Sequence, residues 1–311
     1  MKLSEIATFL ELLRDSDVGP TWVEFHNRLN TVETAVLHSG VHVGTVAHDI
    51  STAMQNICAS VKDFRGNVGY LITQLEQIII QLEPEYYQNS WRLYEEEMRW
   101  ETNQYILDRR LVIDPESEIN MRARLRSYGD WRLPGMIIRP GLETHIEEMV
   151  PLDPLYVVDQ HQDLITPAIS KFTEQYQRRL RLYVVNDYQQ NDPLKALPNG
   201  QFGLIFAYNF FNYKPIEVIE TYLREFYQKL RPGGVAMFTF NNCDRPNGMG
   251  LAERNFMCYT PGRRIRSMAQ NYGFEIVYNQ TGPYNLDWME LRKPGEIVSL
   301  RGGQSLAQIK R

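Results

Sequence analysis

The strongest constraint on the fold of this chain is the alternation of short apolar runs with amphipathic segments between residues 131 and 292. Short apolar runs are typical of buried strands, and the amphipathic segments between them are typical of helices that cover a sheet. The pattern indicates a doubly wound α/β layer, whose final pair of strands is close enough for an antiparallel hairpin at the sheet edge. Seven strands are predicted, over residues 135–139, 155–159, 180–186, 203–208, 234–240, 274–278 and 286–291.

Three motifs follow one another within this segment. In YLREFYQKLRPGGVAMFTFNN, residues 222–242, Pro232 is expected to stop a helix and Gly233–Gly234 to turn the chain into a buried strand with positive φ. Together with LPNGQFGLIFAYNFFNY and YTPGRRIRSMAQNYGFEIV, this segment resembles class I S-adenosylmethionine-dependent methyltransferases, except that Gly203 replaces the usual Asp. The resemblance covers about half the chain. It implies a Rossmann-like, seven-stranded methyltransferase-type sheet over residues 131–293.

The resemblance also implies S-adenosylmethionine as a cofactor and names the residues that would hold it. Gly141 would be the first glycine of the loop after the first strand, and Asp159 would accept hydrogen bonds from both ribose hydroxyls. Asn186 and Asp187 would lie near the adenine amino group, and Tyr208 would face the sulfonium.

The glycine loop departs from the family pattern. Arg139 stands where an acidic residue is usual, and Glu143 replaces the second glycine. Side chains in this loop would crowd the cofactor, and the Glu143 carboxylate would repel a cofactor that itself carries a carboxylate. An alternative register makes residues 155–163 the first strand and loop, but that loop contains no glycine and the strand count falls by one. Retained and lost cofactor binding both remain open.

Candidates for a catalytic role are few. Tyr208, Asn209 and Asp244 are expected near the methyl acceptor, with Tyr259 as a further candidate. The residues that end the fifth strand, NNCD at 241–244, lack the Asn/Asp-Pro-Pro-aromatic and Pro-Cys motifs of DNA base methyltransferases. A DNA base as acceptor is therefore disfavoured.

The N-terminal part follows a different pattern. Apolar residues between 22 and 82 alternate in steps of three and four, with one extra four-residue step after Ile50, which is a heptad seam with a stutter. About 60 helical residues would extend roughly 90 Å. We expect residues 1–82 to form a helical coiled coil that self-associates. β-Branched residues at both core positions favour a trimer over a dimer. The alternative is an intramolecular hairpin that turns near residues 66–69.

Two further segments complete the predicted organisation. Residues 83–130 are expected to form helices that dock on the C-terminal domain, with Trp91, Tyr94, Met98 and Ile106 facing inward and a short helix over 116–127. Residues 294–311 are a C-terminal tail.

Composition excludes several classes of protein. The 33 Lys and Arg against 38 Asp and Glu give a net charge of -5, which disfavours binding to nucleic acid. We find no signal peptide and no apolar run long enough to span a membrane. Three cysteines are too few and too scattered for a disulfide framework. His38 and His42 share a helix face, but no third ligand follows, so no metal site is expected.

The whole pattern is also similar to uncharacterised methyltransferase-like proteins of T4-like marine tailed phages, through EPEYY at 83–87 and SLRGGQSLAQI at 299–309. That similarity implies an oligomeric, virion- or tail-associated structural protein with a degenerate methyltransferase-like domain. It would assemble with other virion proteins and lie in the virion or the host cytoplasm. The alternative is an active S-adenosylmethionine-dependent methyltransferase whose acceptor the sequence does not name.

Overall fold

The chain divides into two compact units, Met1–Glu83 and Pro84–Arg311. In the first unit, the described residues are helical. The predicted coiled coil lies almost entirely outside the described residues, as do His38, His42, Met98 and Ile106, so it stays a prediction. The computed structural model describes residues 4, 6–8, 10–11, 69–70, 72–73, 75–96, 115–139, 145–170, 172–188, 191–281 and 286–296.

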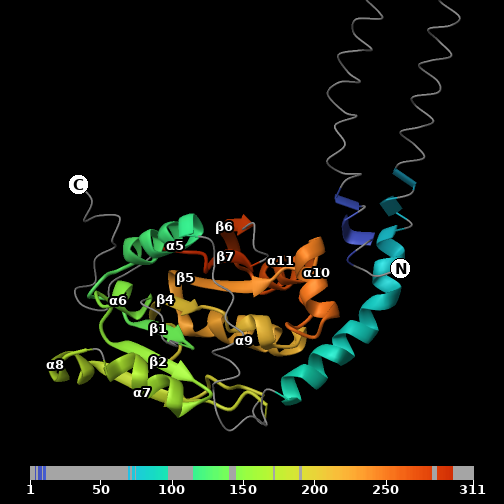
Figure 1. Ribbon diagram of the computed structural model, residues 1–311. Helices are drawn as coiled ribbons and strands as arrows, with labels where there is room; N and C mark the ends of the chain where they lie inside the picture. The colour runs from blue at the N-terminus through green and yellow to red at the C-terminus, as the bar shows by residue number, and fades with distance from the viewer. Residues whose placement is uncertain are drawn as a thin grey trace, which may run out of the picture. The chain divides into compact units, whose positions relative to one another are not determined.

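The second unit is an α/β layer (Figure 1) that begins with a helical stretch over residues 84–96. Its helices are α5 (Pro115–Ser127), α6 (His145–Glu148), α7 (Gln162–Ser170), α8 (Glu174–Gln177), α9 (Ile216–Lys229), α10 (Pro246–Glu253) and α11 (Gly262–Asn271), with a 3-10 turn η1 (Phe211–Tyr213). Its strands are β1 (Gly135–Ile138), β2 (Leu155–Asp159), β3 (Leu180–Val184), β4 (Phe202–Ala207), β5 (Leu230–Asn241), β6 (Glu275–Thr281) and β7 (Leu286–Arg292).

These strands form one sheet in the order β3-β2-β1-β4-β5-β7-β6. The five strands from β3 to β5 are parallel, while β7 runs antiparallel to both β5 and β6. The prediction of seven strands with an antiparallel hairpin is confirmed. The alternative register is wrong, because β1 pairs with both β2 and β4 at the centre of the sheet.

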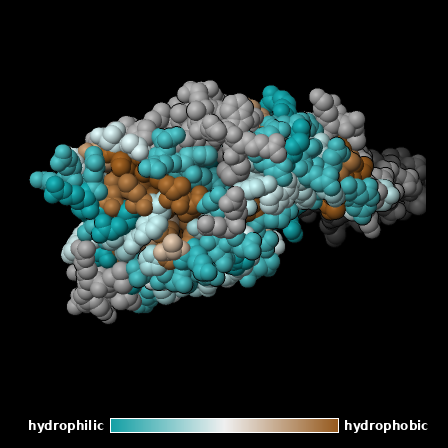
Figure 2. Space-filling view, turned by 90° about the horizontal axis from the view of Figure 1, so that it is seen from below, coloured by the Kyte–Doolittle hydropathy of each residue, from teal (hydrophilic) through white to brown (hydrophobic). Residues whose placement is uncertain are grey.

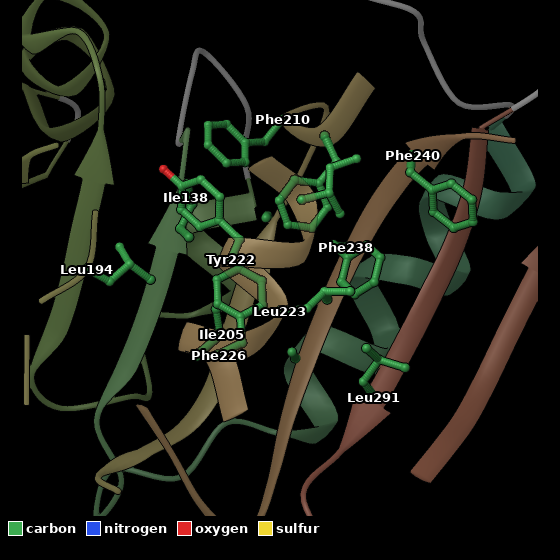
Figure 3. Close-up of a cluster of buried hydrophobic side chains, with 14 of the residues drawn as sticks. Ile138, Leu194, Ile205, Phe210, Tyr222, Leu223, Phe226, Phe238, Phe240 and Leu291 are labelled. Atoms are coloured by element: carbon green, nitrogen blue, oxygen red, sulfur yellow. The ribbon is translucent and has the colours of Figure 1, made fainter. Parts of the chain in front are cut away.

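Two apolar clusters cover the two faces of the sheet. Helices α5, α6, α7 and α10 contribute to the cluster on one face. Helices α9 and α11 and residue Tyr94 of the N-terminal helix contribute to the cluster on the other. Figure 3 shows this second cluster, in which Phe210 meets Tyr222 edge-on with ring centres 5.0 Å apart. Because the helices after β1 and after β4 lie on opposite faces, the sheet is doubly wound.

The turn from α9 into β5 differs from the prediction. The helix ends at Lys229, three residues before Pro232, so proline does not stop it. Of the two glycines, only Gly233 has positive φ, at 76°. Gly234 is required for close approach, because a Cβ there would lie 2.7 Å from the backbone oxygen of Phe202.

Strand β3 forms one edge of the sheet. Leu182 and Val184 are exposed on it, at 48% and 58% of their surface. The coloured part of the face in Figure 2 is mostly hydrophilic, with a larger area of hydrophobic atoms at the left and a smaller one at the right. An edge strand with exposed apolar side chains is a site where another strand can add, and Arg181 supplies the charge that limits such pairing.

Helix α5 is fixed to the sheet by a buried carboxylate. Glu290 on β7 is fully buried and accepts hydrogen bonds from the Arg124 guanidinium, one of them at 2.5 Å, and from the Tyr128 hydroxyl at 2.6 Å. Burial and the neighbouring Glu290 charge raise the pKa of Tyr128 to about 12. The helix therefore depends on one acidic side chain for its polar contacts with β7.

We expect Glu290→Ala to lower the free energy of unfolding by about 2 to 4 kcal/mol, because it leaves Arg124 without its buried partner. Urea unfolding followed by tryptophan fluorescence measures the change. Glu275→Ala is the matched control, since Glu275 pairs with Arg292 on the same hairpin but both side chains are about half exposed. Its loss should stay within about 0.5 kcal/mol. Equal losses in the two variants would contradict the assignment.

Candidate functional site

The crevice at the carboxyl ends of β1 and β4 is the candidate site. The order of strands along the chain reverses between these two neighbours, so the connections that leave them diverge to opposite faces. Open α/β sheets bind ligands at such a switch point. The side chains that follow the strand ends there are Arg139 after β1, Gln160 after β2, Asp187 after β3 and Lys214 after β4.

Asp159 ends β2 and is fully buried. Its Oδ1 accepts a hydrogen bond of 3.0 Å from the backbone nitrogen of His161. Its Oδ2 has no hydrogen-bond partner. Burial raises the pKa of this carboxyl to about 6, although the charges of Arg139 and Lys214 oppose the shift. One carboxylate oxygen is thus held by the turn, and the other has an open acceptor position.

Asp187 differs from Asp159 because side chains surround it. It accepts hydrogen bonds from the Tyr94 hydroxyl, from the Gln160 amide and, at 3.1 Å, from the Tyr222 hydroxyl. The Lys214 ammonium lies 3.4 Å from its Oδ2. Burial and the Asp187 charge raise the pKa of Tyr222 well above its usual value. Four groups of the protein therefore already satisfy this carboxylate.

Two buried cations balance the two carboxylates. Lys214 is fully buried, donates a 2.5 Å hydrogen bond to Gln160 Oε1, and places its ammonium 4.6 Å from the centre of the Tyr94 ring. Arg139 is 6% exposed, has a positive φ of 55°, and its guanidinium lies 5.3 Å from the centre of the Phe210 ring. The formal charges of the two cations and the two carboxylates cancel, so the crevice is neutral overall when all four are ionised.

The helical residues 84–96 pass along the carboxyl ends of the strands (Figure 1). In its middle, the Ser90 hydroxyl accepts a 2.8 Å hydrogen bond from the backbone nitrogen of Tyr259, in the segment between α10 and α11. Four residues further on, Tyr94 contacts Asp187 and lies 5.7 Å, centre to centre, from the Tyr188 ring. The helix thus joins the segments that follow β5 and β3, with the crevice between them.

Tyr94 is inward as predicted and fully buried, whereas Trp91 is 36% exposed, with its ring centre 5.8 Å from that of Tyr94.

The predicted site residues divide into two groups. Asp187 and Asp159 lie in the crevice: Gln160 bonds to Asp187 and to Lys214, and the Lys214 charge acts on Asp159. Asn186 is exposed. Gly141 and Glu143 lie outside the described residues.

The predicted catalytic candidates have structural contacts. Tyr208 packs on His145 with ring centres 4.5 Å apart. Asn209 has positive φ, and its backbone nitrogen donates to Thr239 Oγ1 at 2.8 Å. Asp244 accepts a 2.7 Å hydrogen bond from the backbone nitrogen of Arg263 at the start of α11 and pairs with the side chain of Arg263. Tyr259 packs against Tyr86 and Tyr87. None of these contacts joins the four candidates to Asp159.

Sequence reasoning missed Lys214, Gln160 and Tyr222. Lys214 offered one signal, because it directly follows the buried aromatic run 210–213 and a lysine there has little access to water. Gln160 and Tyr222 carried no local signal.

The residues of the crevice fit an adenosyl group only in part. The open Oδ2 of Asp159 suits a ribose hydroxyl. The position assigned to the adenine amino group does not fit, because Tyr94, Gln160, Tyr222 and Lys214 already satisfy Asp187. Among the described residues, the ribose position therefore fits an adenosyl group and the adenine position does not.

No family model matches the chain, and no curated protein matches it. Solved structures of S-adenosylmethionine-dependent methyltransferases are similar at low identity. The N-methyltransferase NodS from Bradyrhizobium japonicum, in complex with S-adenosyl-L-homocysteine, is 16% identical, covering 67% of this chain and 100% of its own, with a TM-score of 0.45.

A methyltransferase from Mesorhizobium loti is 12% identical over 55% of this chain and 96% of its own, with a TM-score of 0.44. Magnesium protoporphyrin IX methyltransferase from Synechocystis, with bound S-adenosylmethionine, is 13% identical over 57% and 78%, with a TM-score of 0.43.

Within the described ranges, no group of three or more His, Cys, Asp or Glu side chains is arranged to hold a metal ion. In the same part of the chain, no helix has the length and apolar character needed to cross a bilayer.

The raised pKa of Asp159 predicts a pH-dependent stability. A carboxyl whose pKa rises from 3.8 to about 6 on folding stabilises the protein below pH 4, and this contribution is lost as the pH rises through 6. Asp159→Asn removes the titration. The difference in unfolding free energy between variant and wild type should therefore shift by about 2 to 3 kcal/mol in favour of the variant between pH 4 and pH 7.

Urea unfolding at several pH values measures this difference. Asp163→Asn is the matched control, because Asp163 is exposed at the start of α7 and stays solvated in both states. A constant difference for Asp159→Asn across this range would show that the carboxyl is not desolvated.

Proposed function

We propose that this chain is an oligomeric structural protein, encoded by a tailed phage and associated with its virion or tail, in which a degenerate methyltransferase-like domain serves as a packing or binding module. One observation carries the proposal. Asp187, at the place where the fold would receive the adenine of a cofactor, is satisfied by Tyr94, Gln160, Tyr222 and Lys214. A fold of this kind does not by itself imply catalysis.

Three further features support this proposal. The catalytic candidates Tyr208, Asn209 and Asp244 are used in packing or in backbone hydrogen bonds. Glu143 would crowd the loop after β1. The heptad pattern over residues 22–82 would assemble the chains, as a trimer in preference to a dimer, and other virion proteins would be the partners.

A second candidate is an active S-adenosylmethionine-dependent methyltransferase of unknown acceptor. The open Oδ2 of Asp159 favours it, because a buried carboxylate oxygen without a partner costs stability unless a ligand satisfies it.

Calorimetric titration with S-adenosylmethionine and S-adenosylhomocysteine separates the two candidates. We expect no binding by the full-length wild-type protein at ligand concentrations up to about 1 mM, where the binding free energy would be only about 4 kcal/mol. Micromolar binding that is lost in Asp159→Ala but kept in Asp163→Ala would favour the enzyme and overturn the structural proposal.

Light scattering tests the assembly. We expect the full-length protein to have about three times the mass of a 36.4 kDa chain, and charges in the seam to dissociate it. The test variant is Val43→Asp with Ile50→Asp, and the matched control is Thr45→Asp with His48→Asp, which lie off the seam. A monomeric wild type, or an oligomer that survives both double substitutions, would contradict self-association through residues 22–82.

A further inference from the structure

We propose that Lys229 and Asn199 form an isopeptide bond, a covalent link between the lysine side-chain nitrogen and the carbonyl carbon of the asparagine side chain, with release of ammonia. The inference goes beyond the proposed function and does not depend on it. Its basis is one contact at the amino ends of β4 and β5, away from the crevice, where the loop before β4 meets the end of α9.

The Lys229 side chain is a buried amine that donates to two uncharged carbonyl oxygens. The residue is 3% exposed, and its Nζ donates to the backbone oxygen of Leu197 at 2.9 Å and to Asn199 Oδ1 at 2.8 Å. Burial lowers the pKa of Lys229, although the charges of Glu225 and Asp192 oppose the shift. More of this amine is therefore unprotonated at neutral pH than of a solvated lysine, and the unprotonated amine is the nucleophile.

The Asn199 side chain is held near this amine by the backbone that follows it. The backbone nitrogen of Gly200 donates to the Gln228 oxygen at 2.9 Å, and that of Gln201 donates to the Lys229 oxygen at 2.9 Å. Both acceptors belong to the last turn of α9. The loop and the helix end therefore keep their relative position, which keeps the amide and the amine together.

The earlier part of the loop is fixed by a buried acid. Glu225, one turn before Lys229 on α9, is 2% exposed and accepts a 2.6 Å hydrogen bond from the backbone nitrogen of Leu194. Burial raises the pKa of Glu225, although the Leu194 hydrogen bond and the Lys229 charge oppose the shift. An ion pair between the two side chains would hold the lysine as a cation, and burial works against that pair.

The reaction exchanges one amide for another. The unprotonated Lys229 nitrogen attacks Asn199 Cγ, the Nζ–Cγ bond forms, and the Cγ–Nδ2 bond breaks. The proton that Nζ loses is gained by the departing nitrogen, which leaves as ammonia, so no oxidant, reductant or co-reactant is consumed. Cγ is one bond beyond Oδ1, and a small shift of the amine brings the reacting atoms to the separation of about 3 to 3.5 Å that the attack needs. Asn199 is exposed, so ammonia can escape to water.

The bond would close a covalent loop between positions 30 apart in the chain. A cross-link of this kind stabilises a protein chiefly by reducing the freedom of the unfolded chain. Because β4 lies between β1 and β5, the link would tie the end of α9 to the middle of the sheet.

The experiment is mass spectrometry of the full-length protein after incubation at pH 9, where more of the lysine is unprotonated. We expect the wild-type mass to fall below the sequence mass by one ammonia. A tryptic digest should contain one fragment that joins the peptides of Asn199 and Lys229, since trypsin does not cleave after the modified lysine. The loss should be slower at pH 6, where the amine is protonated.

Lys229→Arg should abolish the joined fragment, because the guanidinium keeps the positive charge and the donors but is not a nucleophile. Lys293→Arg is the matched control and should behave as wild type. Burial also lowers the pKa of Lys293, but its Nζ donates to the backbone oxygens of Tyr227 and Leu230 rather than to a side-chain amide.

A competing reaction gives the same change of mass. An asparagine before a glycine can lose ammonia when the glycine backbone nitrogen attacks its side chain, and Gly200 follows Asn199. That product would form equally in Lys229→Arg and would join no second peptide. The joined fragment therefore distinguishes the two reactions.

Asn199→Ala serves if Lys229→Arg does not fold, since it replaces an exposed loop residue, and it should also abolish the joined fragment. Asn247→Ala is its matched control, an exposed asparagine that also precedes a glycine, and should keep the fragment. Wild-type protein that retains its full sequence mass at pH 9 would overturn the proposal. A loss of ammonia that persists in Lys229→Arg without any joined fragment in wild type would overturn it as well.

Discussion

The buried ammonium group of Lys214 is the interaction on which the crevice depends. It contacts Gln160, Asp187 and the Tyr94 ring, and its charge opposes the rise in the pKa of the buried Asp159 carboxyl. A charge in such a place is stable only when its partners are fixed around it. The loop after β4, the turn after β2, the end of β3 and the N-terminal helix are therefore constrained together by one side chain.

The side chains around Lys214 occupy the gap at the switch point of the sheet. In an open α/β sheet the divergence of the chain at the switch point leaves a gap that a ligand usually fills. Here side chains from β1, β2 and β4 enter the gap, and a tyrosine from a preceding helix completes it. The domain thereby provides partners for the Asp187 carboxylate and the Lys214 ammonium, whereas Asp159 Oδ2 is buried without a hydrogen-bond partner.

The sequence was sufficient to predict the sheet but not the contents of the crevice. Strands show as local apolar runs, so β2 was predicted at its observed bounds and the hairpin β6–β7 was recognised. The start of β5 was missed by four residues, because Leu230 already pairs with Phe202 while the Pro-Gly-Gly motif suggests a turn there.

The contacts of the crevice depend on residues far apart in the chain. Asp159 and Asp187 were found through their places at strand ends, but Tyr94 is 93 positions from Asp187, and Lys214 is 54 from Gln160. The spacing of residues within a motif carries no information on contacts between residues so far apart in the sequence. For the same reason Tyr208 and Asp244 were assigned to chemistry, although packing and a helix start already use them.

The placement of the N-terminal helix sets an order of events during synthesis. Residues 84–96 leave the ribosome long before their partners, because Tyr259, which donates a hydrogen bond to Ser90, is synthesised 169 residues later. At about 5 to 20 residues per second, that interval lasts roughly 10 to 30 seconds. During it, the apolar face that carries Tyr94 is without its final partners. The self-association proposed for residues 22–82 would therefore come before closure of the domain.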